Sequence, residues 1–258
     1  FPTVNGVGYV FSDTSLKAKT IRIFVRILYK WAFANAEKVF FHNVDDMDLF
    51  ISLKIIKKGQ GVVINGSGID LDYFYKSEIK TVDSFLFASR LLKSKGIFEF
   101  ISAAKIVKEK YPNSEFIIAG SFFSNPKGIK PKDLSEMNKN NLVKFIGNVG
   151  DVRKIILNSS VVVLPSYREG VPHILLEALS MGRPVITTNV PGCKETVIDG
   201  VNGFLVEKYD CIMLADKMIT FIENKDLLQK FGDNSRQLAE SKFSLNAINQ
   251  QILLTMRL

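Results

Sequence analysis

The stretch from Pro165 to Gly203 constrains the fold of this chain more than any other part. It follows a short apolar, β-branched run at 160–164, which is typical of a buried strand. Pro172 suits a first helical position, and a helix is predicted from His173 to Met181, with a second apolar strand at 184–188. Because this helix is apolar almost all round, the strand–loop–helix–strand order predicts an α/β fold in which the helix is buried.

One residue of the predicted helix conflicts with its apolar character. Glu177 shares a helical face with Ile174, Ala178 and Met181. A Glu on such a face is almost never buried without a partner. Two interpretations stay open: a structural hydrogen bond to a backbone N–H or an Arg, or a carboxylate that accepts hydrogen bonds from the hydroxyls of a ligand.

A second carboxylate, Glu169, stands eight residues before Glu177. The two carboxylates therefore flank a Gly-containing loop that leads into the N-terminus of the predicted helix. A helix N-terminus carries free N–H groups and a partial positive charge, so it can hold an anion such as a phosphate.

These residues resemble a known family. Residues 169–177, E-G-V-P-H-I-L-L-E, resemble the E-x7-E signature of the retaining family-4 glycosyltransferases. The following G-R-P-V-I-T-T and P-G-C-K-E-T-V-I-D-G-V-N-G-F-L-V resemble the next strand and loop of that family. The P-G-C-K-E-T-V segment is most similar to bacterial N-acetylgalactosaminyl- and galactosyltransferases that build lipid-linked oligosaccharides and O-antigens.

The resemblance implies the GT-B type of α/β fold. The chain would hold a Rossmann-like nucleotide-binding domain with a parallel sheet, plus the tail of a first Rossmann-like domain. It also implies an enzyme, a hexosyltransferase that moves a hexose or N-acetylhexosamine from a UDP-sugar to a glycan acceptor. The acceptor would be linked to a lipid diphosphate, in the synthesis of surface polysaccharide, lipopolysaccharide or oligosaccharide.

The domain organisation follows from alternating patterns. From Ser84 onward, strand and helix signals alternate, which predicts parallel βαβ units. The further strands are predicted at 84–88, 115–119, 142–146 and 203–206, and the further helices at 96–110, 152–157, 210–224, 225–240 and 245–256. We expect 1–64 to be the incomplete C-terminal part of the acceptor-side domain and 65–242 the nucleotide-sugar-binding domain. Residues 243–258 would form a terminal helix that can cross back to the first domain.

Composition sets further bounds. The chain has 258 residues and begins with Phe1 rather than Met, so we expect it to lack an N-terminal part. No apolar run of about 18 residues predicts a spanning helix. Two Cys do not make a disulfide framework, which favours a reducing compartment, so the cytoplasm is the expected location. The net charge of +8 suits nucleic acid, anionic membrane or phosphorylated ligands, but no nucleic-acid-binding motif is visible.

A long helical pattern from Ser15 to Glu37 carries much of this charge. Its apolar stripe consists of Ile21, Phe24, Val25, Leu28, Trp31 and Ala32. Its basic face consists of Lys19, Arg22, Arg26 and Lys30. The helix is either an ordinary solvated surface helix or a peripheral contact with anionic lipid at the cytoplasmic face of the inner membrane.

Two cations follow the predicted strand at 84–88. Arg90 and Lys95 belong to the segment A-S-R-L-L-K-S-K-G, at the strand's carboxyl end, where open α/β sheets bind ligands. A lone Arg or Lys is usually a solvated surface charge, but this segment matches the R-L-x-x-x-K-G pattern of the resembled enzymes. There the matching cations contact the donor diphosphate. No metal cluster is visible, so we expect transfer without a metal or other cofactor, with cations stabilising the leaving group.

The resemblance implies roles for the remaining candidates. Glu169, together with Arg90 and Lys95, would form the catalytic group, with Glu169 on the hydroxyls of the transferred sugar. Glu177 would accept hydrogen bonds from the ribose. Gly170, Val171 and Pro172 would lie against sugar and phosphate, and Gly147 and Val149 would lie near the base. The remaining substrate-binding candidates are His173, Gly120 at the end of a strand, and Gly6 in the N-G-V-G loop. His173 is either a phosphate donor or a helix residue without a role, and Gly6 lies either in a donor loop or in a plain turn.

Two other functions stay open for this sequence, and a third is disfavoured. The fragment could bind a nucleotide-sugar without transferring it, or the fold could serve a sugar epimerase, because fold does not fix chemistry. A dinucleotide dehydrogenase is disfavoured, since no G-x-G-x-x-G follows a first strand.

Overall fold

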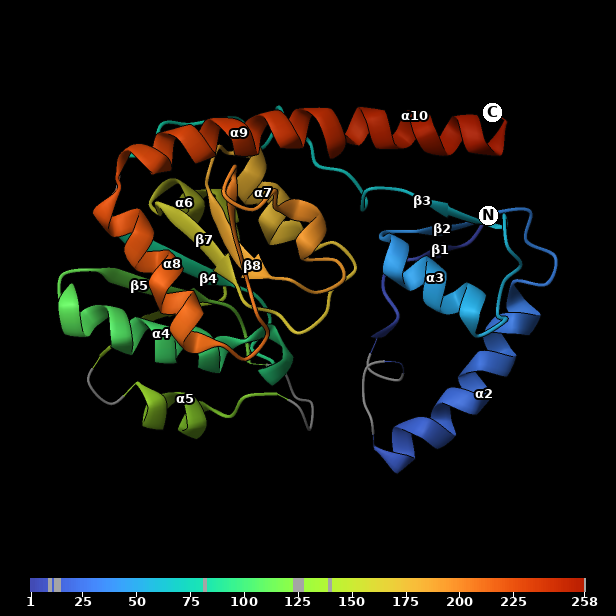
Figure 1. Ribbon diagram of the computed structural model, residues 1–258, viewed down its shortest axis with the longest axis horizontal. Helices are drawn as coiled ribbons and strands as arrows, with labels where there is room; N and C mark the ends of the chain where they lie inside the picture. Colours follow the sequence, from blue (N-terminus) through green and yellow to red (C-terminus); the bar gives the residue numbers. More distant parts are fainter. Residues whose placement is uncertain (9–10, 12–14, 81–82, 123–127, 139–140, 258) are drawn as a thin grey trace.

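The computed structural model describes residues 1–8, 11, 15–80, 83–122, 128–138 and 141–257. In this part of the chain, two separate sheets organise an α/β protein, and every strand pair in them is parallel (Figure 1). The smaller sheet has the strand order β1-β2-β3, and the larger has the order β6-β5-β4-β7-β8-β9. The GT-B type of α/β fold expected from the sequence is confirmed by solved structures described below.

The smaller sheet belongs to the N-terminal unit. Its strands are β1 (Thr3–Val4), β2 (Val39–Phe41) and β3 (Gly61–Val63), and its helices are α2 (Leu16–Ala32) and α3 (Val44–Ser52). Phe33, Phe41 and Phe50 are buried in its core, where aromatic rings pack against one another. This core is separate from that of the larger sheet.

The larger sheet is the centre of the second unit. Its strands are β4 (Ser84–Ala88), β5 (Glu115–Ala119), β6 (Lys144–Gly147), β7 (Val161–Leu164), β8 (Val185–Thr188) and β9 (Gly203–Val206). Every residue of β4, β7 and β8 is buried, which explains their continuous apolar sequences, because helices cover both faces of such a sheet. The strand order reverses between β4 and β7, and ligands bind at such reversal points beyond the carboxyl ends of the strands.

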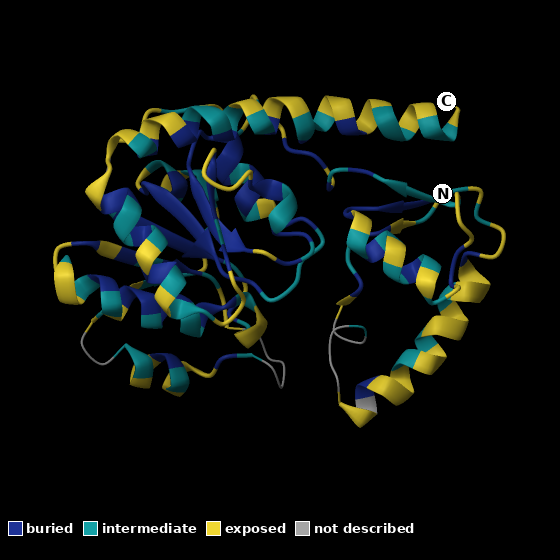
Figure 2. Cartoon of the chain, viewed as in Figure 1, coloured by how far each residue is buried: buried dark blue, intermediate teal, exposed yellow. Residues whose placement is uncertain are grey.

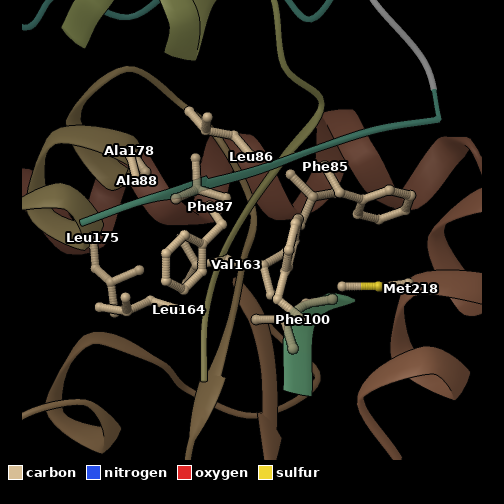
Figure 3. Packing of buried hydrophobic residues seen from close by; sticks show 14 of the residues in the cluster. Phe85, Leu86, Phe87, Ala88, Phe100, Val163, Leu164, Leu175, Ala178 and Met218 are labelled. Carbon is tan, nitrogen blue, oxygen red and sulfur yellow. The ribbon is translucent and has the colours of Figure 1, made fainter. Parts of the chain in front are cut away.

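Helices cover both faces of this sheet. They are α4 (Ile97–Lys110), α5 (Pro131–Met137), α6 (Val152–Leu157), α7 (His173–Ser180), α8 (Cys211–Glu223) and α9 (Asp226–Lys242). Helix α4 packs against α8, and α7 packs against α9 (Figure 1). Figure 3 shows the core between these layers, where Phe85 and Phe87 of β4 lie near Phe100 of α4 and Met218 of α8.

The C-terminal helix α10 (Leu245–Met256) follows α9 and extends over the N-terminal unit (Figure 1). Gln251 Nε2 donates a hydrogen bond of 3.1 Å to the carbonyl oxygen of Val63, at the end of β3. Thus α10 and the segment after β3 both connect the two units.

Helix α2 differs from the sequence expectation in two respects. It ends at Ala32 rather than Glu37, because Phe33 turns into the core of the N-terminal unit and its N–H caps the helix. The predicted apolar stripe is mostly exposed: Phe24 is 66% exposed, Leu28 65% and Trp31 82%, as the yellow ribbon of α2 in Figure 2 shows. Ala18 is the buried position instead, since a different face of the helix meets the core. No helix in the described ranges has both the length and the apolar character to span a bilayer.

Candidate functional site

The candidate residues of the second unit gather at the carboxyl ends of its central strands. Arg90 and Lys95 follow β4, Gly120 follows β5, and Glu169 follows β7. Parallel strands present all their carboxyl ends at one edge, so these loops share one side of the sheet. Arg90 is exposed there, whereas Lys95 is largely buried.

Lys95 and Glu169 form an ion pair between the loops after β4 and β7. Their side chains are only 16% and 12% exposed, so water screens the pair weakly. Ser166 Oγ also donates to Glu169 Oε1, at 2.5 Å. Two of the three residues expected to be catalytic therefore meet directly, and the carboxylate of Glu169 is held by two donors.

A glycine makes this approach of the two loops feasible. Gly96, which precedes α4, has φ +75°, and a Cβ there would lie 2.0 Å from the carbonyl oxygen of Pro165 at the end of β7. Any side chain would push the loop of Lys95 away from the loop of Glu169. Gly96, the glycine that follows Lys95 in the R-L-x-x-x-K-G pattern, is thus required by packing as well as by its backbone conformation.

Gly120 and Gly147 meet at the ends of β5 and β6. The N–H of Gly120 donates a 2.7 Å hydrogen bond to the carbonyl oxygen of Gly147. A Cβ on Gly120 would lie 1.9 Å from the carbonyl oxygen of Ser89, so this position also allows a close backbone approach. Val149 is half-buried and packs against the core of the second unit.

Glu177 lies in α7 and is half-buried. Its backbone carbonyl oxygen accepts from the N–H of Met181. Its carboxyl group forms no hydrogen bond or ion pair with the other described residues, so the structural hydrogen bond that the sequence left open is not found there. Desolvation raises the pKa of its carboxyl group to about 7. A partly buried carboxyl group without a protein donor is suited to accept hydrogen bonds from a ligand.

The residues between the two carboxylates contact the segment that joins the units. Pro172 is buried and precedes the first residue of α7, and Val171, 8% exposed, lies against Gly66. His173 is exposed, and its Nε2 lies 2.8 Å from Ser67 Oγ. The start of α7 is therefore tied to residues 66–67.

The N-terminal unit contributes Gly6 to this region. A Cβ on Gly6 would lie 3.4 Å from the Cα of Gly170, and a Cβ on Gly170 would lie 1.7 Å from the carbonyl oxygen of Asn5. The N-G-V-G loop and the loop after β7 thus touch backbone to backbone.

Three residues at this junction were not indicated as site residues by the sequence. Asn43 and Asp46 at the start of α3 contact Gly170 and Arg168. The available signal for Asn43 and Asp46 was their place just after the apolar run at 39–41, which forms β2, because polar side chains at the carboxyl ends of parallel strands often serve ligands. Their partners lie more than a hundred residues away, so no local pattern could pair them. In the part of the chain that the structure describes, no group of three or more His, Cys, Asp or Glu could hold a metal ion.

Comparison with known proteins yields a family match. The family model described as "Glycosyl transferases group 1" matches residues 72–238. A capsular polysaccharide biosynthesis glycosyltransferase of Staphylococcus aureus is 35% identical over 66% of this chain and 45% of its own length. The N,N'-diacetylbacillosaminyl-diphospho-undecaprenol alpha-1,3-N-acetylgalactosaminyltransferase of Campylobacter jejuni is 26% identical over 98% of this chain and 69% of its own.

Solved structures share the fold. The crystal structure of Anabaena HepE in complex with UDP-glucose superimposes with a TM-score of 0.84, at 23% identity, over 99% of this chain and 71% of that one. The sucrose-phosphate synthase of Thermosynechococcus elongatus gives a TM-score of 0.82 at 24% identity, over 99% of this chain and 66% of that one. The chain thus spans about half to two thirds of the length of the relatives and structures that it matches.

Proposed function

Since this chain belongs to the group 1 glycosyltransferases, we propose that it transfers a hexose or N-acetylhexosamine from a UDP-sugar to a lipid-diphosphate-linked glycan, with retention of configuration. The observation that carries the proposal is the Lys95–Glu169 pair at the carboxyl edge of the larger sheet, together with the carboxyl group of Glu177 in α7, which has no donor among the described residues. The names of two relatives support the acceptor class, since both act on sugars linked to undecaprenol diphosphate.

The roles divide along the donor molecule. Glu177 would accept hydrogen bonds from the ribose, Gly147 and Val149 would lie near the base, and Arg90 and Lys95 would hold the diphosphate. Glu169 would hold hydroxyls of the sugar. Lys95 has three N–H donors, so it can keep Glu169 and still donate to a phosphate oxygen. The support for UDP as the nucleotide is the HepE structure, which was solved with UDP-glucose.

In the transfer step, these groups would stabilise the negative charge of the leaving group. When the bond between sugar and diphosphate breaks, negative charge develops on the leaving oxygen. Preorganised cations and the N–H groups at the start of α7 lower the energy of that charge more in the transition state than in the ground state. A retaining transfer therefore depends on Arg90 and Lys95, and we expect it without a divalent metal.

Calorimetric titration and a donor screen test this proposal. Arg90→Ala and Lys95→Ala should each weaken the binding of UDP by about tenfold or more, because charged hydrogen bonds contribute about 1.5–3 kcal/mol, while uridine binding changes little. Lys105→Ala, on the exposed face of α4, is the matched control.

The full-length protein should transfer sugar from at least one UDP-sugar to a lipid-diphosphate acceptor. Equal losses for UDP and uridine, or no transfer from any donor, would contradict it.

A second candidate is favoured by one observation. The chain spans 45% of the S. aureus relative and 64% of an Escherichia coli galactosyltransferase, so the fragment alone can lack part of an acceptor site. In that case these 258 residues bind the donor without transferring its sugar. Binding of UDP by the fragment, with transfer only by the longer protein, distinguishes this candidate.

We further propose that α2 lies on the cytoplasmic surface of an anionic membrane. Large apolar side chains face solvent along this helix: Leu16, Ile23, Phe24, Ile27, Leu28 and Trp31. Lys19, Arg26 and Lys30 are exposed too, and no Asp or Glu occurs in the helix. This combination suits an interfacial helix, which would bring the enzyme to a lipid-linked acceptor.

A further inference from the structure

We propose that Asn43 and Asp46, in the N-terminal unit, are positioning residues that hold Glu169 in place for sugar transfer. They act through Arg168 and Gly170, the two neighbours of Glu169 in the sequence. The inference rests on the proposed function, because it explains how the contact between the units affects a residue on the donor sugar.

The first contact is a partly buried ion pair, in which the Arg168 side chain is 26% exposed. Asp46 is fully buried, and its Oδ1 accepts a hydrogen bond from Arg168 Nη2. Asp46 Oδ2 accepts from Asn43 Nδ2 at 3.2 Å, so both carboxylate oxygens have donors. Removing one member of a buried pair leaves the other charge uncompensated. The geometry of Arg168 is therefore tied to α3.

The second contact is made by Asn43. Its Oδ1 caps α3 by accepting from the N–H of Asp46 at 2.8 Å, which fixes the orientation of the amide. Its Nδ2 then donates to the carbonyl oxygen of Gly170 at 3.0 Å. One side chain thus joins the start of α3 to the residue that follows Glu169.

The same loop is held from the other side by its own unit. The N–H of Glu169 donates to the carbonyl oxygen of Pro191 at 3.0 Å. A Cβ on Gly192 would lie 2.3 Å from the carbonyl oxygen of Glu169, so the two backbones pack closely. The backbone of 168–170 is therefore clamped between the 191–192 turn and α3, and the position of Glu169 requires both.

A third contact between the units differs from the first two. Lys194 and Asp45 form an ion pair of 2.8 Å, but their side chains are 39% and 37% exposed. Exposed pairs contribute about 0–1 kcal/mol. Asp45 lies in the same helix as Asp46 but forms only an exposed pair. The effect of substituting Asp46 can therefore be compared with the effect of substituting Asp45.

The consequence concerns transfer rather than nucleotide binding. The side chains assigned to the ribose and diphosphate, those of Glu177, Arg90 and Lys95, belong to the second unit, whereas Asn43 and Asp46 contact the carbonyl oxygen of Gly170 and the side chain of Arg168. Glu169 is assigned to the sugar, and misplacement of a positioning group by about 1 Å can cost about 100-fold in rate. Loss of the clamp should therefore lower kcat and leave the affinity for UDP nearly unchanged.

Steady-state kinetics and titration of the full-length protein test the inference. Asp46→Asn and Asn43→Ala should lower kcat by about 10- to 100-fold, with the Kd for UDP within about threefold of wild type. Arg168→Gln should have a similar effect, and Arg168→Lys, which keeps the charge, should restore part of kcat. The Asp46→Asn/Arg168→Gln double variant should be no slower than the slower single variant. Asp45→Asn is the control and should change kcat by less than about threefold.

Amide hydrogen exchange gives a readout that does not need activity. In Asp46→Asn, the N–H of Glu169, which donates to the carbonyl oxygen of Pro191, should exchange at least about tenfold faster than in wild type, while those of β7 stay protected. If wild type transfers no sugar, the proposed function fails, and exchange still tests the clamp. Unchanged exchange of the Glu169 N–H, or a kcat for Asp46→Asn equal to that of Asp45→Asn, would overturn the inference. A matching loss of UDP affinity would also overturn it, because it would indicate general damage to the fold.

Discussion

At the scale of single residues, Glu177 is a carboxyl group whose proton affinity is set by burial. Burial raises its pKa from 4.5 to about 7, so the folded protein holds this proton at pH values where the unfolded chain has released it. Its contribution to stability is present below about pH 4.5 and is lost as the pH rises through about 7. At neutral pH, a ligand that supplies hydrogen-bond donors would relieve this penalty.

Glu177 therefore predicts a pH dependence of donor binding. Ribose hydroxyls donate more strongly to a carboxylate than to a neutral carboxyl group, so affinity for a UDP-sugar should rise between about pH 6 and about pH 8. Both phosphates of a UDP-sugar are esterified and do not titrate in this range. Calorimetry in buffers of different ionisation enthalpy should detect proton release on binding.

The matched variant for this measurement is Glu177→Gln. It should bind a UDP-sugar with an affinity that hardly changes with pH and is about tenfold weaker than that of wild type at about pH 8. A wild-type protein that releases no proton and shows the same flat profile would remove Glu177 from the donor site.

At the scale of elements, most of the large apolar side chains of α2 are exposed rather than packed against the N-terminal unit. The helix buries Ala18 against the N-terminal unit, while Phe24, Leu28 and Trp31 face solvent. A helix with apolar residues on an exposed face and basic residues beside them is suited to a membrane interface that contains anionic lipid, as proposed above for α2. The basic residues supply the salt-dependent part of such binding and the apolar residues the rest.

Liposome binding tests α2 directly. The full-length protein should bind vesicles that contain anionic lipid and should ignore neutral ones. Replacing Lys19, Arg26 and Lys30 with Gln should weaken this binding by on the order of 100-fold at low salt, at about 1 kcal/mol for each cation. Trp31→Ser should weaken it at all salt concentrations.

The charge-matched control for α2 is the triple variant Lys105→Gln, Lys225→Gln and Lys230→Gln. These lysines are exposed on the second unit, so the variant loses the same charge. We expect it to bind vesicles as wild type does. If both triple variants lose binding equally, net charge rather than α2 explains it.

At the scale of the whole molecule, Arg183 joins distant segments of the second unit. It is fully buried, and its guanidinium donates to carbonyl oxygens of Ile156 and Ser159 near the end of α6, and of Ser77 in the segment before β4. Burial lowers its pKa to about 10, so it stays charged at neutral pH. Its planar fork satisfies several carbonyl oxygens at once, which a lysine cannot do.

Substitution of Arg183 should therefore destabilise the protein strongly. Arg183→Lys leaves buried carbonyl groups without donors, and each such group costs about 1–3 kcal/mol, so a loss of about 3 kcal/mol or more is expected. The free energy of unfolding from denaturant titration measures it. Arg26→Lys on exposed α2 is the control and should stay within about 0.5 kcal/mol of wild type. Equal midpoints for the two variants would contradict this role of Arg183.

The sequence by itself determined most of the second unit. The strands predicted at 84–88 and 115–119 have these bounds in the structure, and the helix that carries Glu177 begins at His173, inside the E-x7-E segment, as predicted. Buried parallel strands are continuous apolar runs, and helix ends are marked by Gly and Pro, so both signals are local. The candidates Arg90, Lys95, Glu169 and Glu177 were likewise chosen from short segments, and their roles stay predictions.

Only the tertiary structure decided which distant groups meet. Lys95 pairs with Glu169 across 74 residues of sequence, and Arg168 pairs with Asp46 across 122. It also decided which apolar face of α2 packs and which stays exposed, since that helix carries apolar residues on more than one side. The physical reason is the same in each case. Periodicity and caps report the conformation of a segment, whereas pairing between segments depends on how the whole chain packs.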